Sequence, residues 1–292
     1  MATPGSLADL IAPLDLGGFR DLLRRRVLHF HRGTERNRFA GLIDWAALRE
    51  AIAGGAFPPE KLRVTNDGRT VDPRLYLRLG KADITSLEKV LESGASLIAE
   101  PLESYVPALA ALCGDIAKHI PEKIYAGAIA TTGAGGAFRL HYDPEDLIIL
   151  QVEGSKRWML YGPPVALPVR GMTKPKPPDC PPHFDKILEP GDFLFVPAGN
   201  WHRCENGPGR SLHLGIFIEP PTGFHAVKAL VPRLAEREAF RRPLLRFGGE
   251  DERAAHEAAL KAELIRLIGE TSLTDLAFEA LKAKPPAKPR DE

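Results

Sequence analysis

One stretch of sequence decides the fold: Arg139-Leu-His-Tyr-Asp-Pro-Glu-Asp-Leu-Ile-Ile-Leu-Gln-Val-Glu-Gly-Ser-Lys-Arg-Trp-Met-Leu-Tyr161. Its central run, Leu147 to Val152, is apolar, of strand length and rich in β-branched residues. Gly154-Ser155 can form a tight turn, and Lys156 to Tyr161 continues as a second strand. The pattern predicts a hairpin with a two-residue loop.

Side chains alternate across a strand, and residues that pair directly in a hairpin share a face. The predicted face that carries Lys156 also contains Leu147, Ile149, Gln151 and Trp158. An ammonium on the inner face of a sheet requires an anionic partner. A dicarboxylate co-substrate would be such a partner.

Three side chains around this stretch have metal-ligand chemistry: His141, Asp143 and the downstream His202. Two imidazoles and one carboxylate can occupy one face of a six-coordinate iron(II) and leave three positions open. A His-x-Asp motif alone is weak, because His183-Phe-Asp185 repeats it in the same chain. We interpret that second copy as structural, since it follows a proline-rich loop and has no basic residue at the matching offset.

The sequence before His202 predicts further short strands. Pro190-Gly191 fits the central pair of a type II turn, and Phe193 to Val196 is a buried-strand run. Residues 210–218 form another such run after the turn 206–209. Short strands that bring a ligand pair and a distant histidine together predict a small double-sheet barrel.

Residues from about 123 to 224 resemble the Jumonji-C branch of the cupin superfamily, and within it the bacterial ribosomal-oxygenase-like proteins. The matching segments are His141-Tyr-Asp143, Leu150-Gln-Val-Glu-Gly-Ser-Lys-Arg-Trp158, Leu188-Glu-Pro-Gly-Asp-Phe-Leu-Phe-Val-Pro197, Trp201-His202 and Ser211-Leu-His-Leu214. The N-terminal segments 39–48, 62–64 and 93–98 also look similar. The resemblance implies a mainly β fold with flanking helices (α+β), a double-stranded β-helix or jelly roll.

The resemblance also implies a catalytic site that uses Fe(II), 2-oxoglutarate and O2. Carried over residue by residue, His141, Asp143 and His202 are the catalytic iron ligands, and Lys156 pairs with the far carboxylate of 2-oxoglutarate. Related hydroxylases often have a polar residue at the positions of Phe138 and Leu147, which are apolar here. Further co-substrate contacts are therefore expected from three other residues: Tyr125, Ser211 and His213. His213 is equally compatible with a core histidine.

Composition narrows the function classes. The chain has 292 residues, 44% hydrophobic and 26% charged, with a net charge of +1, which is ordinary globular composition. This charge gives no general attraction to nucleic acid or to a membrane surface, and the apolar runs are too short to span a bilayer. Three widely spaced cysteines suggest no disulfide framework, and no signal peptide is recognised. A cytoplasmic protein is expected, and a homodimer is left open.

Four regions are predicted: an N-terminal helical region at 1–120, the barrel core at 121–220, a C-terminal helical segment at 221–283, and a disordered tail at 284–292. Helical spacing is found at 19–28, 45–53, 84–91, 106–119 and 251–268. In the last of these helices, Ala255, Leu260, Leu264 and Ile265 are predicted to form one apolar stripe.

The resulting functional hypothesis is a dioxygenase that hydroxylates an unactivated C–H bond of an amino-acid side chain in a protein or peptide. Ribosomal oxygenases usually carry a larger region after the barrel, so a small-molecule substrate, such as a free amino acid or a natural-product intermediate, is the first alternative. The second is a non-catalytic metal-binding cupin. The glycine-rich segment 133–136 and the loop 163–182 are the candidate lids over the site.

Overall fold

The computed structural model describes residues 3–55, 57–133, 138–207, 209–245 and 247–282. Most of the glycine-rich segment 133–136 and the whole tail 284–292 therefore lie outside the described residues. Residue contacts divide the chain into two units, Met1–Glu219 and Pro220–Glu292. Each unit is described by itself below.

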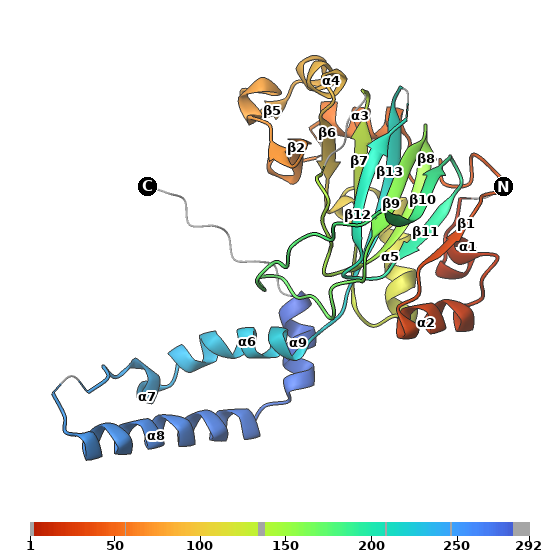
Figure 1. Ribbon diagram of the computed structural model, residues 1–292. Helices are drawn as coiled ribbons and strands as arrows, with labels where there is room; N and C mark the ends of the chain where they lie inside the picture. Colours follow the sequence, from red (N-terminus) through yellow and green to blue (C-terminus); the bar gives the residue numbers. More distant parts are fainter. Residues whose placement is uncertain (1–2, 56, 134–137, 208, 246, 283–292) are drawn as a thin grey trace. The chain divides into compact units, whose positions relative to one another are not determined.

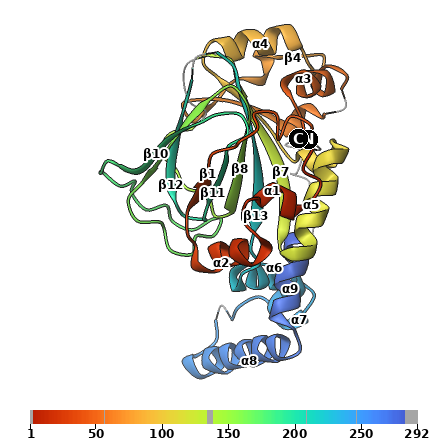
Figure 2. The ribbon, with the colours of Figure 1, turned by 90° about the vertical axis from the view of Figure 1, so that its right-hand side faces the viewer.

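Two antiparallel sheets form the body of the first unit (Figures 1 and 2). In spatial order, the larger sheet contains β1 (His29–His31), β11 (Phe193–Val196), β8 (Asp146–Glu153), β13 (Ser211–Glu219), β7 (Lys123–Thr131), β6 (Ser96–Ala99), β2 (Leu62–Asn66) and β3 (Arg69–Thr70). The smaller sheet contains β10 (Pro182–Leu188), β9 (Lys156–Tyr161) and β12 (Trp201–Asn206). Figure 2 shows the two sheets facing each other, and this arrangement confirms the predicted double-stranded β-helix.

Strand β8 is buried on both faces, which explains its continuous apolar run. Ile148 and Leu150 belong to the larger hydrophobic core, which also contains residues of the helices. Leu147 and Ile149 belong to a second cluster that includes Trp158 of β9. The alternation of the strand thus divides one apolar segment between the helix-covered core and the barrel interior.

The predicted hairpin between the two central strands is wrong. β8 pairs with β11 and β13 in the larger sheet, whereas β9 pairs with β10 and β12 in the smaller one. Gly154-Ser155 is a corner between the sheets. Gly154 has φ +61°, and a Cβ there would lie 1.9 Å from the backbone oxygen of Arg210. Only glycine fits this corner without strain.

Helices of the N-terminal region cover the outer side of the larger sheet (Figure 2). They are α1 (Leu7–Ile11), α2 (Leu16–Arg25), α3 (Trp45–Ala53), α4 (Ile84–Glu92) and α5 (Pro107–His119). Asp15, Asp44 and Asp83 cap the starts of α2, α3 and α4 by accepting backbone N–H groups. The helix predicted over 19–28 ends at Arg25, because Arg26 adopts the left-handed conformation with φ 54°.

The remaining elements of this unit are short. They are the 3-10 turns η1 (Pro59–Lys61), η2 (Pro73–Leu75) and η3 (Leu102–Ser104), and the pair β4 (Leu77–Arg78) and β5 (Lys81–Ala82).

The second unit contains α6 (Gly223–Ala235), α7 (Glu238–Arg241), α8 (Glu250–Gly269) and α9 (Leu273–Lys282). Its small core consists of Leu230, Leu267 and Leu276. The apolar stripe predicted for α8 is wrong as a buried face, because Ile265 is 71% exposed and Leu267 is the buried residue of this helix. No helix among the described residues is long and apolar enough to cross a membrane.

Candidate functional site

The three predicted metal ligands converge at one end of the barrel. His141 and Asp143 precede β8, and His202 lies near the start of β12 in the opposite sheet. The backbones of His141 and His202 exchange two hydrogen bonds, of 3.1 and 2.7 Å, which join the two sheets at this point. Asp143 is held by its carbonyl, which accepts the N–H of Gly199 at 2.8 Å.

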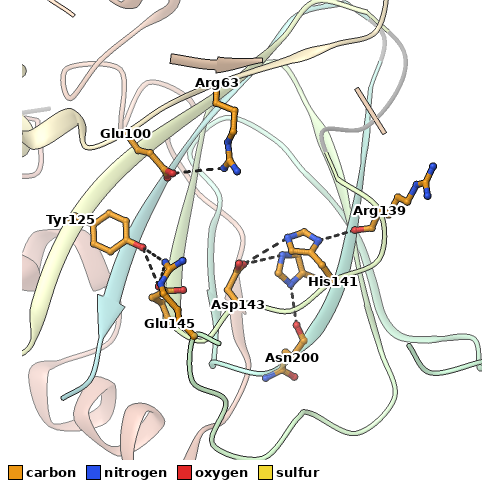
Figure 3. Close-up of polar contacts among 10 residues, drawn as sticks. Arg63, Glu100, Tyr125, Arg139, His141, Asp143, Glu145 and Asn200 are labelled. Atoms are coloured by element: carbon orange, nitrogen blue, oxygen red, sulfur yellow. Dashed lines mark hydrogen bonds and ion pairs between the residues drawn. The ribbon is translucent and has the colours of Figure 1, made fainter. Parts of the chain in front are cut away.

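The ligand atoms are close enough to share one metal ion. One atom from each of His141, Asp143 and His202 lies within 4.8 Å of the others. The Asp143 Oδ2 atom is 3.9 Å from His141 Nε2 and 3.5 Å from His202 Nε2. Figure 3 shows the Asp143 carboxylate directed toward the imidazoles.

Hydrogen bonds fix which imidazole nitrogen faces the metal position. His141 Nδ1 lies 2.8 Å from the carbonyl of Arg139, and His202 Nδ1 lies 3.0 Å from that of Asn200. A carbonyl only accepts, so each Nδ1 carries the proton and donates it. Each Nε2 is left with a free lone pair, which is the usual arrangement for a metal-ligating histidine. Burial also lowers the pKa of His202 to about 4, so its imidazole is neutral at pH 7.

This donor set fits iron(II). Two neutral imidazoles and one carboxylate on one side of a cavity match the facial triad of non-haem iron(II) oxygenases, with open positions on the cavity side. The cavity has a volume of about 640 Å³. Its lining includes all three ligands together with Lys156.

Lys156 lies inside the cavity wall and is only 1% exposed. No hydrogen bond or ion pair of its ammonium group is found with the described residues. Burial lowers its pKa to about 8, with only the Cys204 thiol nearby to oppose the shift. A buried cation without a carboxylate leaves a large desolvation cost uncompensated. The bore is therefore suited to receive an anionic ligand at this point.

Two of the three other residues predicted to contact the co-substrate line the cavity, and the third does not. Tyr125 and His213 line the same cavity. His213 is 4% exposed, and its ring packs edge-on against Trp158 at 5.6 Å between centroids. Burial holds its pKa well below the usual value. Ser211 is buried and accepts a 3.0 Å hydrogen bond from Gln151 Nε2, but it is not one of the described residues that line the cavity.

Two charged groups at the site were not predicted from the sequence. Glu145 is 1% exposed and forms an ion pair with Arg170 from the loop between β9 and β10. The Tyr125 hydroxyl donates to Glu145 at 3.3 Å, and burial raises the pKa of this carboxyl group to about 7. The sequence signal that could have identified Glu145 is its spacing. It follows His141 and Asp143 at alternate positions, and alternate residues share a face in an extended chain.

The motif His183-Phe-Asp185 lies on β10, and none of its three residues is among the described residues that line the cavity. Asp185 accepts two hydrogen bonds from Arg157, at 2.7 and 2.6 Å, on the outer surface. This position supports the structural interpretation of the second copy.

The fold and the site together define a double-stranded β-helix protein with two histidines and one carboxylate placed to hold a metal ion. The family model of the JmjC domain matches residues 111–225, a range that contains every ligand of this centre and Lys156. This match agrees with the resemblance to the Jumonji-C branch that the sequence predicted for residues from about 123 to 224.

Two sequence relatives illustrate the similarity. The chain is 31% identical over 140 residues to a bifunctional lysine-specific demethylase and histidyl-hydroxylase NO66 of Drosophila mojavensis, covering 46% of this chain and 16% of the relative. It is 42% identical over 78 residues to ribosomal oxygenase 2 of Rattus norvegicus, covering 26% of this chain and 17% of the relative. The matches thus span about a sixth of each relative's length.

Among solved structures, the fold is similar to that of the ribosomal oxygenase YcfD from Escherichia coli in complex with cobalt and 2-oxoglutarate. The TM-score is 0.60 with 18% sequence identity, covering 94% of this chain and 75% of the other. A second structure of the same protein, with cobalt and succinic acid, gives a TM-score of 0.59 with 19% identity, covering 93% and 74%. At this identity the likeness establishes the fold alone.

Proposed function

We propose that this protein is an Fe(II)- and 2-oxoglutarate-dependent oxygenase that hydroxylates an unactivated C–H bond of an amino-acid side chain in a protein or peptide. The observation that carries the proposal is Lys156. A metal-storage barrel or a sensor has no need for a fully buried ammonium in the same cavity as a facial triad. A dicarboxylate co-substrate in this cavity would offer one carboxylate to such a cation.

The residues of the chain divide the work. His141, Asp143 and His202 would hold the iron, and the metal would supply the activation of dioxygen that is coupled to conversion of 2-oxoglutarate to succinate. Lys156 binds the far carboxylate through a charge-assisted hydrogen bond in a site that excludes water. Trp158 stacks on His202 at 5.4 Å between centroids and keeps that ligand in place.

Tyr125 and His213 are proposed as additional contacts of the co-substrate or of the substrate that lies beside it, because both line the cavity. Ser211 is proposed to act one step behind them: its hydroxyl is bonded to Gln151, which pairs with His213 across β8 and β13. We assign the protein to a reducing compartment such as the cytoplasm, which would keep iron divalent and Cys113, Cys180 and Cys204 as free thiols.

A side chain in a protein or peptide is the proposed substrate because the relatives include a histidyl-hydroxylase and a ribosomal oxygenase. The test is succinate release from 2-oxoglutarate by the iron-loaded protein, measured with peptide pools and, separately, with pools of free amino acids and metabolites. We expect peptides to stimulate succinate release and to gain 16 Da, the mass of one oxygen atom. Stimulation by small molecules alone would replace the substrate class, and no 2-oxoglutarate turnover with any pool would refute the oxygenase.

A further inference from the structure

The loop Gly162–Pro181 forms one wall of the metal cavity. It joins β9 to β10 and contributes Val169, Arg170, Gly171, Met172 and Lys174 to the cavity lining. Its base is tied to the barrel by the 2.9 Å hydrogen bond from the Val165 N–H to the carbonyl of Gly199. Gly199 lies between β11 and β12, the strand that contains His202. The loop is therefore built against the metal-ligand segment.

Arg170 is the part of this loop that the barrel holds most firmly. Its Nη2 donates to the Glu145 carboxylate and, at 3.2 Å, to the Tyr125 hydroxyl. Its Nε lies 3.8 Å from Glu219 Oε1. Tyr125 is in turn stacked on Phe217, with 4.7 Å between the ring centroids and an interplanar angle of 4°. Two hydrogen bonds and one longer ion-pair contact thus orient the guanidinium group of Arg170.

These contacts leave part of the guanidinium available. The Arg170 side chain is 60% exposed, and no hydrogen bond of its Nη1 is found in the part of the chain that the structure describes. A guanidinium whose geometry is already fixed loses little entropy when it binds a planar anion. The exposed edge of Arg170 is therefore a preformed donor at the cavity wall.

The charges around the cavity favour an anion on this side. Lys156 and the metal ligand Asp143 are left out of this comparison. The cavity lining then contains three cations, Arg63, Arg170 and Lys174, and two carboxylates, Glu100 and Glu145. Arg63 lies 3.7 Å from Glu100, so that pair offsets itself. Arg139 carries its charge away from the site in Figure 3 and pairs with Asp67 at 3.1 Å. Arg170 is balanced by Glu145 and by Glu219, which also pairs with Lys123. Lys174 forms no ion pair with the described residues, so the surplus positive charge of the loop is that of Lys174.

We propose that Arg170, assisted by Lys174, is a specificity-determining subsite that binds a carboxylate of the substrate beside the carbon that is hydroxylated. The statement that the bound substrate is hydroxylated rests on the proposed function. The statement that Arg170 binds a carboxylate does not. A carboxylate matches the forked donor geometry of arginine and the local surplus of positive charge. The carboxylate can come from an aspartate or glutamate next to the target residue in a peptide, or from a free α-carboxylate.

The test is a binding measurement that needs no turnover. The protein is loaded with nickel(II) and 2-oxoglutarate and titrated with three fluorescent peptide pools of matched sequence. One pool contains Asp and Glu with amidated ends. In the second these residues are Asn and Gln, and the third is the second pool with a free C-terminal carboxylate. Fluorescence anisotropy gives the affinities.

We expect the acidic pool, the free-carboxylate pool or both to bind about tenfold more tightly than the amide pool at low salt, since hydrogen bonds to charged groups are the stronger ones. Which pool gains identifies the source of the carboxylate. The preference should shrink as ionic strength rises. Arg170→Met should abolish the preference and Lys174→Met should reduce it. Arg157→Met, which removes an exposed arginine from the outer face of β9, should leave it unchanged.

Equal binding of the three pools, including no detectable binding of any, would overturn the proposal, as would a preference that survives Arg170→Met. Because Arg170→Met leaves Glu145 buried without its cation, the double variant Arg170→Met with Glu145→Gln removes both partners and tests for misfolding. The subsite predicts that the double variant melts near the wild-type temperature and still lacks the preference. Arg170→Lys should retain part of it. A failure of succinate release would count against the proposed reaction, whereas these affinities judge the subsite alone.

Discussion

The chain contains the same motif twice, as His141-Tyr-Asp143 and His183-Phe-Asp185, and the two copies have different surroundings. The first leads into β8 and meets His202 from the opposite sheet. The second lies on β10 at the edge of the smaller sheet, where His183 is exposed and Asp185 pairs with Arg157. Spacing within a motif therefore says little by itself. The third ligand and a buried cation in the same cavity distinguish a metal centre from a surface strand.

Aspartate replacement should separate the two copies most strongly. Asp143→Ala removes the only carboxylate of the triad and should reduce 2-oxoglutarate turnover below detection, with little loss of stability because two neutral imidazoles are left behind. Asp185→Ala should retain wild-type turnover. Succinate release and bound iron are measured for both variants. Normal activity of Asp143→Ala, or loss of activity in Asp185→Ala alone, would reverse the assignment of the two motifs.

Two lysine replacements compare the cavity wall, where Lys156 lies, with the exposed strand β10, where Lys186 lies. Lys156→Met should raise the 2-oxoglutarate concentration needed for half-maximal activity by about thirtyfold or more, because truncating one partner of a desolvated ion pair costs on the order of 2–5 kcal/mol. Iron binding should stay near normal, since no ligand is changed. Lys156→Arg should be milder. Lys186→Met, on exposed β10, is the matched control. An unchanged 2-oxoglutarate requirement in Lys156→Met would place the co-substrate elsewhere.

Acid should affect the candidate metal site through the buried His202. Burial lowers the pKa of this histidine from 6.5 to about 4. The unfolded chain thus binds its proton more readily than the folded one, so the stability of the metal-free protein should fall as the pH drops from about 6.5 to 4, by about 3 kcal/mol from this residue. Urea unfolding across this range measures the slope. His202→Gln should flatten it, while His183→Gln should not, and equal slopes in all three proteins would exclude His202 as a source.

The smallest effect is expected from the surface pair of the second copy. Asp185 accepts two hydrogen bonds from Arg157, but both side chains are more than a third exposed. Water and salt screen such a pair, so Asp185→Ala should hardly change the melting temperature. A clear drop in melting temperature, larger at low salt, would show that the edge strand depends on this pair.

Local sequence predicted the strands and their faces well, because side-chain alternation is a property of each strand alone. Lys156, Trp158, Ile149 and Leu147 do line one cavity, as the alternation predicted. The pairing of the strands could not be read in the same way. Gly154-Ser155 is compatible with a hairpin or with a corner, and the choice depends on β11 and β13, which lie far along the chain. The prediction that these side chains face one cavity was therefore correct, although the predicted pairing of β8 with β9 was wrong.

The charged wall of the cavity also depends on distant partners. Arg170 lies in a proline-rich loop without periodicity, and nothing near it in the sequence indicates that Glu145 and Tyr125 will receive it. The same limit applies to α8, where an apolar spacing predicted burial but the packing of Leu230 and Leu276 selects Leu267. Sequence patterns identify which side chains can share a face, while long-range packing decides which of them meet a partner.

The corner at Gly154 has a consequence for the order of folding. Because it sends β8 and β9 into different sheets, these consecutive strands do not pair with each other, and the His141–His202 bridge joins segments that lie far apart in the sequence. Such non-local pairings form slowly. We therefore expect the metal-binding pocket to form late in folding, because its ligands come from segments that lie far apart in the sequence. The time at which metal binding appears during refolding should therefore report when one sheet docks onto the other.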